Sequence, residues 1–158
     1  NWDAWHDFST DMLDGVASPG RDADGFAYRA WFRPDETGTA VPSVSVGYDT
    51  MSFEKSLNGY TEAAGYSVAF NWSDLFQADD TIGVAFGAPI SATEKNALKA
   101  DGKTATKDDV DPFLWEAYYS FKPNDSIEIT PGLFGGTDVR SDTNDDIFGA
   151  IVTTTFRF

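Results

Sequence analysis

Few residues of this sequence are placed to carry out catalysis. The chain has no Cys and a single His, His6, which excludes a thiol nucleophile, a disulfide framework and a Cys-based metal site. No Ser lies in a nucleophile-elbow context. Carboxylates are numerous enough for a paired-acid glycosidase, but most lie in Asp-rich stretches where solvation explains them. We therefore predict no catalytic residue and no cofactor.

A second group of candidates consists of charged and polar residues at alternating positions within apolar segments. Side chains of this kind that line a water-filled lumen set its ion preference by the field they create. The alternative is that they pair across neighbouring strands and only stiffen a wall. The candidates for pore lining are Arg29, Arg33, Glu116, Tyr118, Lys122, Glu128 and Arg157.

Metal binding has weak support. The stretch Asp22-Ala23-Asp24-Gly25 has part of a calcium-loop pattern but lacks the later bidentate Glu. The acidic clusters between Asp101 and Asp111 and between Asp138 and Asp146 favour a general field that gathers cations. We predict no specific metal site.

The composition excludes further classes of protein. The 158 residues carry a net charge of −15, and 15% of them are aromatic. An acidic disordered tail would be poor in aromatics, and a nucleic-acid-binding surface would need clustered Lys and Arg, which are absent. No window approaches about 18 consecutive apolar residues, so the sequence predicts no transmembrane helix.

The elements that position the candidate residues follow a period of two, which indicates strands with two different faces. We predict seven strands of nine or ten residues each. They cover Gly25–Arg33, Val41–Asp49, Ala63–Trp72, Asp80–Ala88, Phe113–Lys122, Ser126–Phe134 and the segment from Phe148 to Phe158.

The predicted linkers alternate between short and long. The short ones are Pro34–Thr39, Ser73–Asp79 and Pro123–Asp125, and the long ones are Thr50–Glu62, Pro89–Pro112 and Gly135–Asp146. In an up-and-down meander every second linker lies at the same end. Tight turns at one end and long loops at the other are typical of a barrel that crosses an outer membrane.

The two faces of the predicted strands differ in bulk. One face carries aromatic residues near the strand ends and Ala, Val and Ile in the middle, as in Tyr66, Val68, Phe70 and Trp72. The other is small or polar, as in Ser43, Ser45 and Gly47. A soluble core would place its bulk inside, so we expect an apolar, lipid-facing exterior with two aromatic girdles.

Two segments have helical spacing. Apolar residues from Trp2 to Val16 alternate with Asp at helical intervals, and Ser91 with Glu94 forms a capping-box pattern before Asn96–Ala100. Loop helices over a barrel mouth and ordinary loop structure explain both segments equally well.

Seven strands are too few for a closed outer-membrane barrel, which uses at least eight. We therefore expect residues 1–158 to be the C-terminal part of a larger barrel. Within it, residues 1–23 would form an extracellular loop region. Residues 24–158 would form transmembrane strands with short periplasmic turns and long extracellular loops.

Several motifs resemble one family. The motifs are Asp111-Pro112-Phe113-Leu114-Trp115-Glu116-Ala117-Tyr118-Tyr119, Lys122-Pro123-Asn124-Asp125, Ile129-Thr130-Pro131-Gly132, Gly83-Val84-Ala85-Phe86-Gly87 and the terminal Thr154-Thr155-Phe156-Arg157-Phe158. They are similar to motifs of cyanobacterial outer-membrane porins of the carbohydrate-selective family, often labelled iron-uptake porins. The resemblance covers about residues 24–158. Phe156 and Phe158 resemble the signal that the outer-membrane assembly machinery recognises.

The resemblance implies an all-β, up-and-down antiparallel transmembrane β-barrel of about 16 strands. It also implies a homotrimer in the cell outer membrane, in contact with lipid and lipopolysaccharide, with no catalytic residues. The expected function is a water-filled diffusion channel for small hydrophilic solutes and ions, including sugars or inorganic cations such as iron, with cations favoured. The alternative is a soluble all-β carbohydrate-binding module, which would gather its aromatics on one exposed face.

Overall fold

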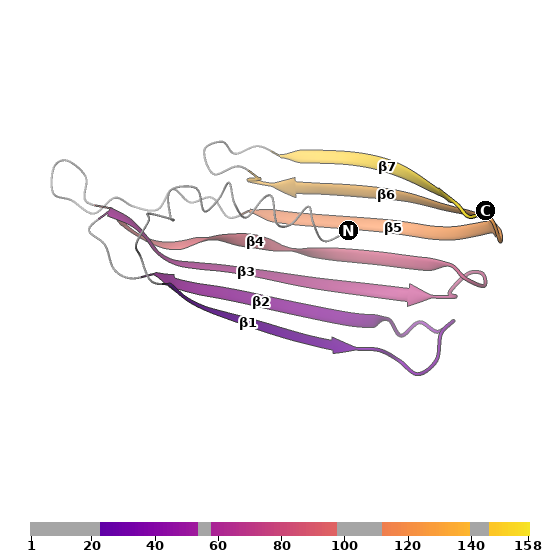
Figure 1. The fold of residues 1–158 in the computed structure, drawn as a ribbon, viewed down its shortest axis with the longest axis horizontal. Coiled ribbons are helices and arrows are strands. Elements are labelled where there is room, and N and C mark those ends of the chain that lie inside the picture. Colours follow the sequence, from indigo (N-terminus) through magenta and orange to yellow (C-terminus); the bar gives the residue numbers. More distant parts are fainter. Residues whose placement is uncertain (1–22, 54–57, 98–111, 140–145) are drawn as a thin grey trace.

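The computed structural model describes residues 23–53, 58–97, 112–139 and 146–158, which form seven strands. The strands are β1 (Ala23–Phe32), β2 (Ser43–Phe53), β3 (Asn58–Ser73), β4 (Thr81–Ala97), β5 (Phe113–Asn124), β6 (Ile127–Thr137) and β7 (Ile147–Phe156). They pair in chain order into one antiparallel sheet, which Figure 1 shows as a single curved layer. The prediction of an all-β, up-and-down arrangement is confirmed.

A single layer of sheet leaves almost no interior. Among the described residues, the buried apolar side chains are Ala63, Ala69 and Val139, and Asp80 is the largest side chain that is fully buried. A soluble domain of this size packs at least two layers around a hydrophobic core. The described residues instead form one layer of sheet with almost no core.

The strands extend further than predicted at the end of the sheet where β2 is linked to β3. β2 continues to Phe53 and β3 starts at Asn58, so most of the predicted loop Thr50–Glu62 is strand. Only residues 54–57 lie between these two strands, whereas residues 33–42 lie between β1 and β2. The predicted contrast between short and long linkers is therefore wrong for the first pair of linkers.

The same extension corrects the prediction for the capping-box segment. Residues Ser91–Ala97 belong to β4 and pair with β3 as far as Asn58 opposite Ala97. Figure 1 shows this β3–β4 hairpin reaching beyond the other strands. Pairing along the length of β3 satisfies the backbone groups that a helix would satisfy internally. The other segment with helical spacing, Trp2–Val16, lies outside the described residues.

A β-bulge lies where β3 and β4 extend beyond the other strands. Ala64 pairs with Ser91 and Tyr66 pairs with Ala88, so β4 has one more residue than β3 in this interval. Pro89 lies in the bulge, a position that tolerates a residue without a backbone N–H. The pairing of β4 with β5 ends just before it, at Gly87 opposite Leu114.

The turn between β3 and β4 is built around the buried Asp80. Its carboxylate accepts hydrogen bonds from the backbone N–H groups of Leu75, Phe76 and Gln77 at 2.8, 3.0 and 3.1 Å. The Tyr119 hydroxyl on β5 donates to the same carboxylate at 3.1 Å. The β1–β2 linker also reaches this turn, because Gly38 N–H donates to the Ser73 carbonyl at 2.8 Å. Three hairpins are thus joined at one end of the sheet.

No helix in the described ranges is long and apolar enough to cross a membrane.

Candidate pore-lining face

The register assigns the side chains to two faces. Residues opposite each other in an antiparallel pair project to the same side, and neighbours along a strand project to opposite sides. One row across the sheet joins Arg29, Gly47, Ser67, Gly87, Leu114, Gly136 and Ile147. We call the face that carries this row the polar face, and the opposite one the apolar face.

The apolar face has an aliphatic band between two groups of aromatic residues. A central row joins Val84, Ala117, Leu133 and Ala150. On one side of this row the rings of Trp115 and Phe148 lie 6.1 Å apart, and on the other side Tyr119 and Phe121 stack at 5.4 Å. The register thus agrees with the predicted order from β4 to β7, whereas the same row continues through Phe70 on β3 to Phe32 on β1.

Large apolar side chains on this face are uncovered. Phe26 is 62% exposed, Phe148 73% and Val152 67%. A contiguous uncovered apolar face of this kind on a soluble protein marks an interaction with a partner or a membrane. Its two aromatic bands match the girdles that hold a barrel at the two interfaces of a bilayer.

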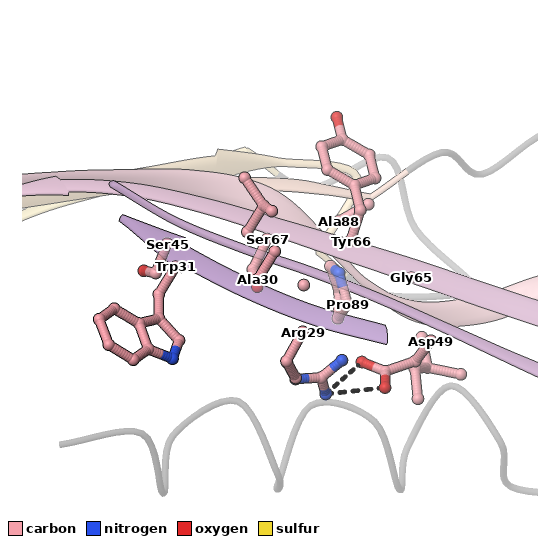
Figure 2. A pocket seen from close by; sticks show the side chains of 13 residues that line it. Arg29, Ala30, Trp31, Ser45, Asp49, Gly65, Tyr66, Ser67, Ala88 and Pro89 are labelled. Atoms are coloured by element: carbon pink, nitrogen blue, oxygen red, sulfur yellow. Dashed lines mark hydrogen bonds and ion pairs between the residues drawn. The ribbon is translucent and has the colours of Figure 1, made fainter. Parts of the chain in front are cut away.

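On the polar face, Arg29 forms an ion pair that the sequence analysis missed. Its Nη2 donates to both carboxylate oxygens of Asp49 at 2.7 and 2.9 Å, and its Nη1 donates to the Tyr28 carbonyl at 2.9 Å. Figure 2 shows this pair on the opposite side of the sheet from Tyr66. Asp49 has the same alternation as the other polar-face residues of β2, which is the signal that could have identified it.

A hollow of about 540 Å³ lies beside this pair. Small residues of neighbouring strands, including Ser45, Gly47 and Ser67, form part of its lining. Trp31 stands at its edge and is 80% exposed; Figure 2 shows its indole on the same side of the sheet as Arg29. An exposed ring next to paired charged groups offers both a stacking surface and hydrogen-bonding groups.

The polar cluster around Glu128 lies near the β5–β6 turn. The Ser120 hydroxyl donates to Glu128 Oε1 at 3.0 Å, and Arg157 Nη2 donates to Oε2 at 2.8 Å. Thr130 Oγ1 donates to Ser120 Oγ at 2.8 Å. Lys122 lies 3.8 Å from an Asp79 oxygen in the neighbouring turn. For Glu128 and Arg157, the structure therefore shows the cross-strand pairing that was the alternative to free lumen charges.

Tyr118 crosses a strand on the polar face. In the register, Asn71, Gly83 and Tyr118 are neighbours on β3, β4 and β5. The Tyr118 hydroxyl donates to Asn71 Oδ1 at 3.0 Å, so the side chain passes over Gly83 to reach β3. Glu116, two residues away on the same face, is exposed and lies opposite Phe134.

The remaining candidates lie at strand ends. Arg33 follows β1 directly and is exposed. Phe156 ends β7 opposite Ile127 and is 59% exposed, and Phe158 lies beyond the strand. Within the described ranges no group of three or more His, Asp or Glu side chains is placed to hold a metal ion. Asp22, from the calcium-loop pattern, is outside those ranges.

One face of the meander exposes large apolar side chains, and the other carries small residues and cross-strand ion pairs, as expected for the wall of a membrane channel. Comparison with protein families gives the same class. Residues 31–158 match the carbohydrate-selective porin, OprB family, and the chain belongs to that family. No curated protein and no solved structure matches the chain significantly. The family is one of channels and implies an outer-membrane protein.

Proposed function

We propose that this chain forms part of the wall of a water-filled outer-membrane channel for small, uncharged hydrophilic solutes such as sugars. The observation that carries the proposal is the difference between the two faces of the sheet: one exposes large apolar side chains, and the other carries the cross-strand ion pairs. The seven strands would be the C-terminal part of a larger barrel, with the polar face toward the lumen and the apolar face toward lipid.

The polar face favours uncharged solutes over ions. Arg29 is neutralised by Asp49, and Glu128 is neutralised by Arg157. The field that such pairs project into a lumen is much weaker than that of free charges of one sign. Hydroxyl groups and the exposed ring of Trp31 remain as contacts for a passing solute.

Several finer features belong to the same proposal. The apolar face would contact outer-membrane lipid and lipopolysaccharide, and the complete protein would assemble as a homotrimer. Phe156 and Phe158, with alternating apolar residues before them, would be read by the outer-membrane assembly machinery. The acidic clusters between Asp101 and Asp111 and between Asp138 and Asp146 would give a mild preference for cations, iron included, through the field that they create.

The test is reconstitution of the purified protein in planar bilayers and in liposomes. We expect stepwise conductance, swelling of liposomes in monosaccharide and disaccharide solutions, and slower swelling as the sugar grows. A protein that inserts in the bilayer but passes neither ions nor sugars would contradict the proposal. The reversal potential in a salt gradient tests the cation preference separately, and a clear anion preference would refute that part alone.

A further inference from the structure

Gly83 has an unusual position beneath the Tyr118 side chain. It lies on the polar face, is buried, and has Asn71 and Tyr118 as its neighbours in the register. A Cβ atom added to Gly83 would collide with two carbons of the Tyr118 ring and would lie 2.7 Å from its hydroxyl oxygen. Only a residue without a side chain leaves room for the ring at this place.

The hydrogen bond to Asn71 fixes how the ring lies. Side chains of a sheet ordinarily stand roughly perpendicular to it. Tyr118 instead runs sideways along the wall, because its hydroxyl is bonded to Asn71 two strands away. A tyrosine that stood upright would project several ångströms further into the space in front of the polar face.

We infer that Gly83 sets the width of the channel at Tyr118 by allowing the ring to lie along the wall. The inference rests on the proposed function, since it requires the polar face to line the lumen. A side chain at position 83 would displace the Tyr118 ring. Because the sheet lies behind the ring, the ring would move toward the lumen. A change at the Gly83–Tyr118–Asn71 row should therefore slow large solutes more than small ones.

The neighbouring glycine on the other side of Tyr118 provides a matched control. Gly132 is opposite Tyr118 on β6 and lies on the same face. A Cβ added there would meet nothing closer than 3.5 Å, which is an ordinary contact. Gly132→Ala adds the same methyl group to the same face of the sheet without displacing the ring.

The experiment compares conductance and sugar permeation of the complete barrel protein, reconstituted as wild type, Gly83→Ala, Gly132→Ala and the double variant Gly83→Ala/Tyr118→Ala. We expect Gly83→Ala to lower single-channel conductance and to slow trisaccharides by a larger factor than monosaccharides. Gly132→Ala should behave as wild type. The double variant should recover at least the wild-type values, because the displaced ring is absent.

Other results would contradict either the inference or the proposed function. Wild-type conductance and permeation of Gly83→Ala would overturn the inference. A double variant with conductance as low as that of Gly83→Ala would also overturn it, because a change in the backbone would then explain the narrowing. Wild-type protein that passes nothing would instead refute the proposed function. If Gly83→Ala does not assemble, Asn71→Ala removes the acceptor without adding bulk. That variant should show lower conductance with more open-channel noise, and wild-type noise would contradict the inference.

Discussion

At the scale of single residues, this sheet repeatedly places a large side chain across a glycine of the next strand. Tyr118 lies over Gly83 and Phe134 over Gly149 on the polar face, and Trp115 lies over Gly135 on the apolar face. Each arrangement covers a glycine that has no side chain to pack and holds a ring close to the wall. On the polar face this holds the rings of Tyr118 and Phe134 close to the sheet.

The Asp80 turn is the residue-scale feature with a clear dependence on pH. Burial by itself would raise the pKa of the Asp80 carboxyl, but hydrogen bonds from the amides of Phe76, Gln77 and Leu75 and from the Tyr119 hydroxyl outweigh it and lower the pKa below its ordinary value. A carboxyl whose pKa is lower in the folded than in the unfolded state stabilises the fold at pH values above its pKa in the unfolded state, which is about 3.9. That stabilisation is lost as the pH falls through the pKa of the carboxyl in the folded state.

We therefore predict that Asp80→Asn lowers the unfolding temperature at pH 7 and that wild type and variant converge in strong acid. The unfolding temperature is measured at each pH by gel electrophoresis, as the temperature at which the band of the folded protein is replaced by the band of the unfolded protein. Asp79→Asn is the control, since Asp79 is exposed and Asn also tolerates its positive φ of 63°. A constant difference between Asp80→Asn and wild type down to pH 2 would refute this account of the turn.

At the scale of strands, the alternation of faces decides which substitutions the protein accepts. Val152 and Thr153 are consecutive residues of β7, both exposed, on the apolar and the polar face respectively. Val152→Arg would place a charge in the hydrocarbon core of the bilayer, and we predict a loss of about 2–4 kcal/mol of stability. Thr153→Arg should cost much less, because its side chain would reach water in the lumen.

Urea unfolding of both variants in lipid vesicles measures the difference between these two positions. Equal stability of Val152→Arg and Thr153→Arg would favour the alternative of a soluble carbohydrate-binding module. In such a module both positions would face water, and surface substitutions of this kind usually change stability by only about 0.5 kcal/mol.

The strands were predictable because alternation is a local property of the sequence. All seven exist within a few residues of their predicted positions. Ser91–Ala97 was the exception, since a capping-box pattern carries no information about β3, the partner that keeps this segment extended. The same limit applies to the polar face. Alternation places Arg29 on it, but the ion pair with Asp49 depends on the register, which no local pattern specifies.

At the scale of the whole molecule, the composition now has a physical explanation. Aromatic residues make up 15% of the chain, and those in the described strands do not fill a core, because the single sheet that these strands form has almost none. Many of them form the two bands of the apolar face. The charges on the described polar face largely cancel in pairs. A wall with these properties suits the passage of uncharged solutes, as membership of the carbohydrate-selective porin family suggests.

The orientation of the two faces is the central claim, and cysteine labelling tests it most directly because these 158 residues contain no Cys. Ser67→Cys and Val68→Cys place single thiols at consecutive positions of β3, on the polar and the apolar face. With the protein in bilayers, we expect a charged, water-soluble thiol reagent to modify Ser67→Cys and reduce its conductance, and to leave Val68→Cys unmodified. Modification of Val68→Cys with Ser67→Cys protected would contradict the account.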